Sequence, residues 1–427
     1  MNPKFNKFDY FLTFIFLLIT SKGTFITQSN IIWGIFLLVL ISYSFYMKRV
    51  FKEDLLVFFY FMVGYLLLIF VRNYTINFLP FSSLISDIIF LFKFILLSYA
   101  FCLALKENLF YQFSTVVYHL TLISLVFYSV QLLGGGNFLF SLGRTVMGVL
   151  PPINDITDTY SNIIVFTYDR IHSIRNSGFA WEPGAFGCFL VFAIYFHLLQ
   201  NDFKLDKRFF ILSIALATTL STTAFVSYAV LSLFIYRQKG GSWNMGLVAL
   251  FTIMALAFIY LPFLGDKITQ TYKEDLEKLE DFESIKFDLQ YYLENGGEVK
   301  MNRFSSAVFT YRHLKEKLIL GVGNTYGDIP STVYEVPISN FNLSNSIFDF
   351  MARFGLVGLL FLLFQVGRLA FIKFGSYEAS FYQIVIFLGL GFGEPIFALP
   401  LGLIFIFIPY LCVGFEEEDD EEQEIGA

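Results

Sequence analysis

The sequence predicts an all-α polytopic membrane protein of about twelve transmembrane helices with a large, partly helical outer loop. Two observations predict this class. The 427-residue chain is 56% hydrophobic and 15% charged, whereas soluble proteins are about 45–50% apolar and about 25% charged. Its apolar residues also gather in runs of the length that an α-helix needs to cross a bilayer. We therefore expect one membrane domain over residues 1–415.

The apolar runs place the spans in order. We expect them at roughly 8–20, 31–46, 55–71, 84–105, 111–133, 180–199, 208–220, 222–236, 245–264, 345–367, 379–393 and 396–413. Residues 208–236 are interpreted as two short helices broken near Ser221, because a single span would put the second long loop on the wrong side of the membrane. The last two runs are separated by Glu394-Pro395.

Lysine and arginine in the short loops predict the orientation. With a cytoplasmic N-terminus, thirteen of them fall on inner segments, against Lys22 and Arg72 outside. Both termini are then cytoplasmic, and the long loops at about 134–177 and 265–344 are outside. The acidic residues 416–427 are expected to form a solvated cytoplasmic tail.

The second outer loop contains predicted helices. Residues 267–294 are charged, and a second helix is expected from Asn302 to Leu320, ended by Gly321-Val322-Gly323. Its apolar residues recur at helical spacing and predict one packing stripe. The members of that stripe are Phe304, Ala307, Val308, Tyr311, Leu314 and Leu318.

Several classes of chemistry lack a motif in this chain. It has no Walker sequence, no Gly-rich dinucleotide loop and no metal-ligand spacing. The three cysteines lie in apolar runs and show no zinc spacing. We expect no cofactor, no metal and no nucleic-acid partner.

Arginines in the two outer loops are the main candidates for binding. Arg170, Arg175, Arg303 and Arg312 fall there, and guanidinium groups grip phosphates with two hydrogen bonds, which suits a lipid-linked phosphate or diphosphate. The alternative is that they pair with acidic residues of the same loops.

Proton transfer has two candidates. Glu182 directly precedes Pro183, a residue that favours the first turn of a helix. It stabilises the start of that helix, accepts a proton from a sugar hydroxyl, or holds one of the arginines in place. His313 is the second candidate base.

Charges within the spans are costly and are expected to face the bundle interior. Asp349 and Arg353, four residues apart, are interpreted as a structural ion pair. Asp87 is also expected inside. Lys93 has no partner at helical spacing and is the better candidate for substrate binding.

Three motifs resemble the bacterial superfamily of O-antigen polymerases and O-antigen ligases, which includes the Wzy-type polymerases of capsule and exopolysaccharide pathways. The first is Arg175-x-x-Gly178-x-x-x-Glu182-Pro183-Gly184. The second is Arg303 followed by Gly321-Val322-Gly323. The third runs from Asn345-Ser346-Ile347 to Arg353-Phe354-Gly355-Leu356-Val357-Gly358. Many relatives, the ligases especially, have a His before the Asn of the third motif; here it is Ser344, which favours the polymerase.

The resemblance implies glycosyl transfer on the outer face of the bacterial cytoplasmic membrane, without metal or nucleotide. Donor and acceptor would be glycans on undecaprenyl diphosphate, within membrane lipid, and a chain-length regulator and a flippase are the implied partners. Arg175 and Arg303 would stabilise the leaving diphosphate, and Glu182 or His313 would act as base. Arg312, Lys93, Arg170 and Asn345 would bind substrate. The alternatives are an O-antigen ligase and a lipid-linked oligosaccharide flippase or transporter.

Overall fold

The fold is taken from a computed structural model, which describes residues 5–23, 29–76, 81–149, 160–171, 173–241, 299–300, 303–324, 341–342 and 345–413. The expected span at 245–264, the charged segment 267–294, Ser344 and the acidic tail lie outside the described residues. The expected spans that are described are all helical.

Most of the described helices follow the apolar runs, and two, Gly136–Met147 and Arg303–Leu314, lie in the expected outer loops. They are α1 (Lys7–Thr20), α2 (Asn30–Tyr46), α3 (Lys52–Thr75), α4 (Phe81–Phe90), α5 (Leu96–Leu105), α6 (Leu109–Val130), α7 (Gly136–Met147), α8 (Pro183–Gln200), α9 (Lys207–Thr218), α10 (Thr222–Gln238), α14 (Arg303–Leu314), α15 (Ser346–Phe374), α16 (Tyr377–Gly393) and α17 (Pro400–Leu411). Short π-helical segments join α4 to α5 and α6 to α7, and 3-10 turns follow α5 and α14. The predicted break between α9 and α10 is confirmed.

Within the described part of the chain, four helical stretches are long and apolar enough to cross a membrane. They are Lys52–Thr75, Phe81–Met147, Pro183–Gln200 and Ser346–Phe374. This agrees with a mostly helical membrane protein, whereas the twelve spans expected from the sequence are not confirmed by the described residues.

Two small sheets interrupt the helical fold. Strands β1 (Tyr160–Asn162) and β2 (Thr167–Asp169) pair antiparallel in the first expected outer loop. Strands β3 (Val299–Lys300) and β4 (Phe341–Asn342) pair in parallel in the second. The first expected outer loop, at about 134–177, begins with the helix α7.

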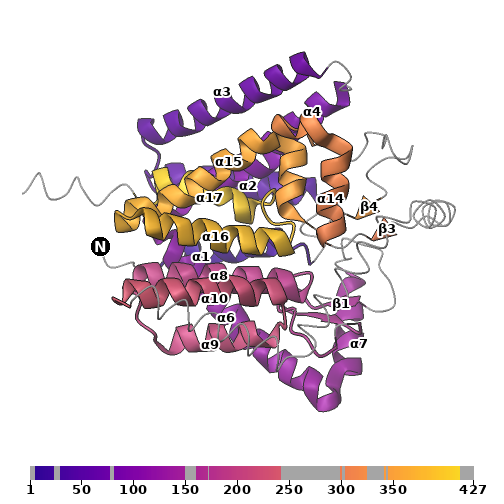
Figure 1. Cartoon of the computed structure of the whole chain (residues 1–427). Helices are drawn as coiled ribbons and strands as arrows, with labels where there is room; N and C mark the ends of the chain where they lie inside the picture. Colours follow the sequence, from indigo (N-terminus) through magenta and orange to yellow (C-terminus); the bar gives the residue numbers. More distant parts are fainter. Residues whose placement is uncertain are drawn as a thin grey trace, which may run out of the picture.

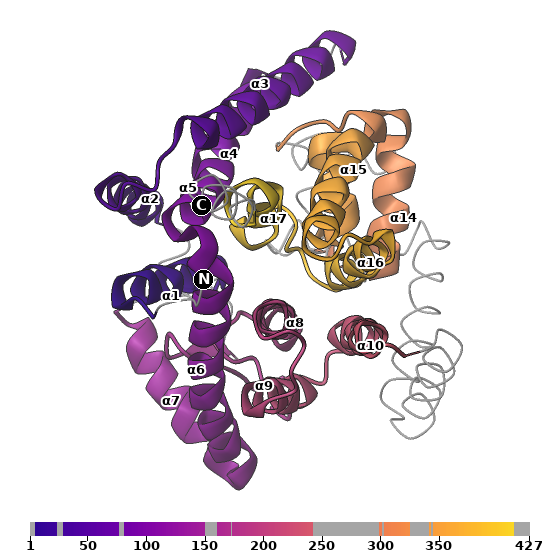
Figure 2. The same cartoon turned by 90° about the vertical axis from the view of Figure 1, so that its left-hand side faces the viewer.

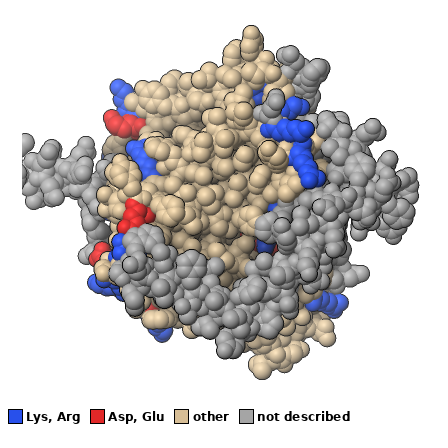
Figure 3. Space-filling view, viewed as in Figure 1, with Lys and Arg blue, Asp and Glu red and all other residues tan. Residues whose placement is uncertain are grey.

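The helices form one bundle. In Figure 1 most of them run from left to right, while α14 lies crosswise at the right-hand end beside β3 and β4. Viewed along the helices, α8 and α17 lie in the middle of the bundle and α3 on its rim (Figure 2). On the face in Figure 3, charged side chains lie mainly toward the left and right margins, with a broad band of other residues between them. This distribution suits a bundle whose middle lies in hydrocarbon.

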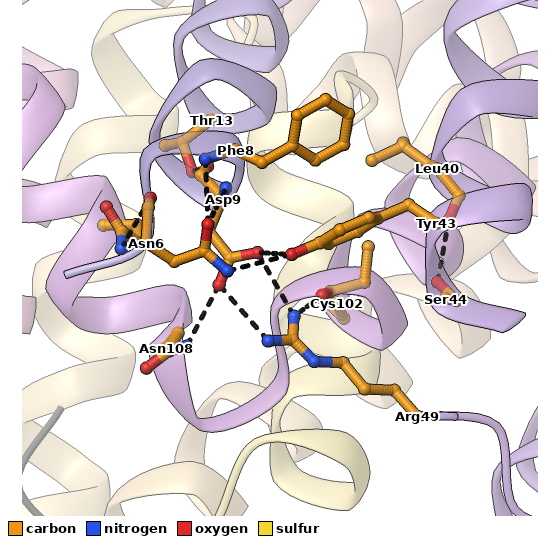
Figure 4. Close-up of polar contacts among 12 residues, drawn as sticks. Asn6, Phe8, Asp9, Thr13, Leu40, Tyr43, Ser44, Arg49, Cys102 and Asn108 are labelled. Atoms are coloured by element: carbon orange, nitrogen blue, oxygen red, sulfur yellow. Dashed lines mark hydrogen bonds and ion pairs between the residues drawn. The ribbon is translucent and has the colours of Figure 1, made fainter. Parts of the chain in front are cut away.

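Polar side chains near the N-terminus join three segments that the charge pattern assigns to the cytoplasmic side (Figure 4). Asp9 is fully buried in α1 and accepts a hydrogen bond from the Tyr43 hydroxyl at 2.6 Å. Arg49 pairs with it at 3.3 Å, and Asn108 donates to it at 3.0 Å. We call these residues, with Asn6, the N-terminal cluster. They hold the start of α1 against the turns after α2 and α5.

A buried ion pair ties α3 and α4 to α15. Arg72 and Asp87 pair while both side chains are almost fully buried. Asn324 donates to Asp87 through its backbone N–H at 2.9 Å and its side chain at 2.8 Å. Arg353 in turn donates to Asn324 at 3.0 Å. Arg353 also pairs with Asp349 at 3.0 Å, which confirms the predicted ion pair.

Two glycines let the turn after α14 pack closely on α15. Gly321 has φ of +70° and Gly355 has φ of +74°. A Cβ on Gly355 would lie 2.2 Å from the carbonyl oxygen of Ile319. Glycine avoids both the strained backbone and the clash, so the Gly-x-Gly turn and the glycine after Arg353 serve this packing.

We predict that Arg72→Ala lowers the free energy of unfolding by about 3–5 kcal/mol, because it leaves the buried Asp87 carboxylate unpaired. Arg237→Ala is the matched control. Arg237 Nε lies 2.7 Å from Glu378 Oε1, but the Arg237 side chain is 23% exposed and the Glu378 side chain 36% exposed. That variant should lose less than about 1 kcal/mol. Chemical unfolding of both variants in detergent measures the difference, and equal losses would contradict this account.

Candidate functional site

The loop Arg175–Gly184, which carries the first motif, leads into α8 and is fixed by buried hydrogen bonds. Asn176 is fully buried, and its Oδ1 accepts the N–H of Gly178 at 2.9 Å and the hydroxyl of Ser124 at 2.7 Å. Gly178 has φ of +51°, and a Cβ there would overlap the ring of Phe186. The glycine of the motif therefore shapes this loop.

Glu182 directly precedes α8, as predicted, with an extended backbone at φ of −155°. Its Oε1 accepts the indole N–H of Trp181 at 2.7 Å. Its side chain makes no capping hydrogen bond to the helix. The carboxylate still lies near the positive end of the helix dipole, which stabilises a negative charge. The Trp181 indole therefore helps to orient this carboxylate.

A second carboxyl group meets Glu182 from a distant part of the chain. Glu394 directly follows α16, is only 1% exposed and interacts with the Glu182 side chain. A Cβ on Gly184 would lie 1.7 Å from Glu394 Oε1. Only glycine at this position of α8 leaves room for Glu394. We call Glu182 and Glu394 the carboxyl pair.

Arg303, the first residue of α14, binds the buried member of the pair. Its Nε–H donates to the carbonyl of Gly393 at 2.8 Å, and Nη2 donates to Glu394 Oε1 at 3.3 Å. The Arg303 side chain is 29% exposed. Asn345 supports it from the start of α15: its Nδ2 donates to the Arg303 carbonyl at 3.3 Å, and its Oδ1 accepts the N–H of Ile347 at 3.1 Å. Asn345 was predicted to bind substrate. In the structure its side-chain amide instead joins α14 to α15.

Two more cations act on the carboxyl pair. Arg175 donates a hydrogen bond from Nε to the carbonyl of Thr219 at 3.0 Å. Its guanidinium also interacts electrostatically with both carboxyl groups of the pair. Lys22 lies in the turn after α1 with its Nζ 5.3 Å from the centre of the Trp181 ring, and it too interacts electrostatically with both. Arg303 thus contacts the pair directly, while Arg175 and Lys22, from two other segments, lie within electrostatic range of both carboxyl groups.

Burial and neighbouring charge shift the pKa values of these groups. Burial, and next the charge of Glu182, raise the pKa of Glu394 well above its usual value, while Arg303 and Arg175 lower it by less. Burial lowers the pKa of Lys22, although nearby carboxyl groups oppose this. Burial also lowers the pKa of Arg175. The site therefore favours a proton on Glu394.

His313, the second predicted base, lies on α14 in a different environment. It is 9% exposed, and its ring stacks on Phe309 with 6.0 Å between the ring centres. Within the described residues neither ring nitrogen has a hydrogen-bond partner. Burial and then the charge of Lys317 lower its pKa, which keeps the imidazole neutral.

The other predicted binding residues have contacts of their own. Lys93 donates to Asn30 Oδ1 at 2.8 Å, so its partner comes from α2 rather than from its own helix. The Arg170 guanidinium lies 3.8 Å from the centre of the Phe140 ring. Arg312 is exposed on α14. The structure thus brings together Arg175, Glu182, Arg303 and Asn345 from the predicted set.

Sequence reasoning missed Glu394 and Lys22. Glu394 was interpreted only as a separator of two spans, and Lys22 only as an outer-side charge. The signal for Glu394 was present, since a carboxylate between the apolar runs 379–393 and 396–413 is costly unless it has a partner. Across the described residues, no group of three or more His, Cys, Asp and Glu side chains converges as a metal site would.

Comparison with known proteins gives one match. A family model described as O-Antigen ligase matches residues 209–363, from α9 into α15. The stretch covers less than half of the chain; it includes Arg303 and Asn345 but neither member of the carboxyl pair. No curated protein and no solved structure matches. The match confirms the resemblance to O-antigen polymerases and ligases that the three motifs predicted.

Proposed function

We propose that this protein joins oligosaccharide repeat units carried on undecaprenyl diphosphate into a surface polysaccharide, such as an O-antigen, a capsule or an exopolysaccharide. The observation that carries this proposal is the carboxyl pair surrounded by Arg175, Arg303 and Lys22 at one site. The family match over residues 209–363 supports an enzyme that acts on lipid-linked oligosaccharides. The segments that form the site belong to the outer side in the predicted topology.

The reaction uses these side chains in two roles. The acceptor hydroxyl oxygen attacks the anomeric carbon of the donor glycan, and the bond from that carbon to the diphosphate oxygen breaks. The diphosphate leaves with the bonding electrons, and Arg175 and Arg303 stabilise its growing charge. Glu182 takes the proton of the attacking hydroxyl. The products are a longer lipid-linked glycan and free undecaprenyl diphosphate.

The ligase is the second candidate, because the matching family model is described as O-Antigen ligase. A ligase would use the same donor and pass the finished polymer to a different acceptor. Ser344 stands where many ligases have a histidine, which favours the polymerase. The carboxyl pair supplies a base for either reaction.

Gel analysis of surface glycan in a deletion strain separates the candidates. If single repeat units reach their final carrier and only the wild-type protein restores long chains, the polymerase is supported. Full-length polymer that stays on the lipid carrier would point to the ligase. Repeat units that stay on the cytoplasmic side would point to a flippase and overturn the proposal.

A further inference from the structure

We propose that Glu182 and Glu394 hold one proton between them in the working enzyme, with Glu394 protonated and Glu182 ionised. Glu394 then acts as a positioning residue that keeps Glu182 as the base and orients it through a hydrogen bond. This inference rests on the proposed function and names the protonation state on which that site depends.

The close approach of Glu394 to the start of α8 favours a proton on one of the two carboxyl groups. Ionised carboxylates only accept hydrogen bonds, so two of them in contact repel each other. Gly184 leaves room for Glu394 to come within reach of Glu182. Glu394 Oε2 is buried and, in the described part of the chain, has no hydrogen-bond partner. A proton on that oxygen makes it a donor and accounts for both observations.

The surroundings place the proton on Glu394 rather than on Glu182. Glu394 is 1% exposed, whereas Glu182 is partly exposed at the start of α8. Glu182 accepts the Trp181 indole N–H at 2.7 Å and lies near the helix dipole, and both stabilise an ionised carboxylate. The opposing contact is Arg303 on Glu394 Oε1 at 3.3 Å. That oxygen remains an acceptor when Oε2 carries the proton.

The proton balance of the reaction follows from this state. The O–H bond of the acceptor hydroxyl breaks as its oxygen bonds to the anomeric carbon, and the proton passes to the ionised Glu182. The pair then carries two protons and must release one to solvent before the next cycle. Glu182 is the partly exposed member and is the route for that release.

Several other charged or titratable groups interact electrostatically with the carboxyl pair. They are Lys22, Arg175, Arg303 and Cys188. Asp349 and Arg353 in turn act on the charge of Lys22. Of these, Lys22 has an amine that titrates on the alkaline side, and burial lowers its pKa. Any alkaline loss of activity must therefore be assigned between Lys22 and the carboxyl pair.

The test is the pH dependence of polymer formation by the full-length protein in liposomes supplied with undecaprenyl-diphosphate-linked repeat units. Wild-type activity should fall at low pH, when the pair gains its second proton, and at high pH, when it loses its last one. Glu394→Gln keeps a neutral hydrogen-bond donor of the same shape. It should retain activity at neutral pH within about threefold and lose the alkaline fall. Lys22→Gln should keep that fall.

Two results would overturn the inference. One is a Glu394→Gln variant that is as inactive as Glu182→Gln at every pH. The other is a Glu394→Gln variant that keeps the alkaline fall of the wild type. If wild type itself forms no polymer, the proposed function fails instead, so the two failures are distinguishable.

Gly184→Ala provides a second, independent variant. Its methyl group would occupy the position of Glu394 Oε1 and push the carboxyl group away from Glu182. Activity should fall at least about tenfold. Gly34→Ala, in α2 with open space around its Cβ, should stay at the wild-type level. Equal activity of the two glycine variants would show that contact between the carboxyl groups is not needed.

Discussion

Replacement of Arg303 by alanine is expected to lower the rate of polymer formation about 100- to 1,000-fold, because an oriented cation is lost where the diphosphate charge develops. The Nε–H bond to the Gly393 carbonyl fixes the guanidinium in place, and the side chain remains 29% exposed for a ligand. The measurement is the initial rate with lipid-linked repeat units in liposomes.

Two further variants test the same point. Arg303→Lys keeps a positive charge but cannot reproduce the fork that holds both Gly393 and Glu394, so it should recover only part of the rate. Lys315→Ala removes an exposed cation just after α14 and should leave the rate unchanged. A rate for Arg303→Ala within threefold of the wild type would argue against a phosphate clamp.

Glu182→Gln is expected to reduce the rate about 100- to 10,000-fold, the range found when a general base is removed. The amide preserves the size of the side chain but cannot take a proton from the acceptor hydroxyl. Glu378→Gln is the control, because Glu378 pairs with Arg237 in a partly exposed contact away from the site. Binding of the donor to Glu182→Gln, measured separately, should be close to that of the wild type. Wild-type turnover by Glu182→Gln would assign the base elsewhere, with His313 the next residue to test.

Hydropathy and charge predicted the helices well. The expected spans that are described are helical, and the short-helix interpretation of 208–236 gave the observed α9 and α10. The N-terminal cluster joins three segments predicted on one side. Assignment of that side to the cytoplasm stays a prediction. These features are local, since each span needs only its own apolar residues.

The helix α14, within the second expected outer loop, shows where periodicity is not enough. Its bounds were predicted well, but Tyr311 of the predicted packing stripe is 62% exposed. Leu314 and Leu318 of the stripe are buried, as predicted, but the buried face also includes Ser306, Thr310 and His313. Apolar spacing predicts the buried face of a helix that packs on an apolar core. This helix lies across the end of the bundle and begins at a polar site.

The candidate site was only half predictable. Arg175, Glu182 and Arg303 could be found because they stand in motifs near predicted membrane boundaries. The role of Glu394 depends on the end of α16 meeting the start of α8, a contact between residues far apart in the chain. No periodicity or local spacing carries that information.

The most direct test of the central claim uses the purified protein in liposomes with one substrate, a repeat unit on undecaprenyl diphosphate. We expect a ladder of longer lipid-linked glycans, with one undecaprenyl diphosphate released for each bond formed. We also expect loss of the ladder in Arg175→Ala and Arg303→Ala variants that unfold at the wild-type denaturant concentration. A ladder of equal strength in both arginine variants, or no ladder with the wild type, would contradict the central claim.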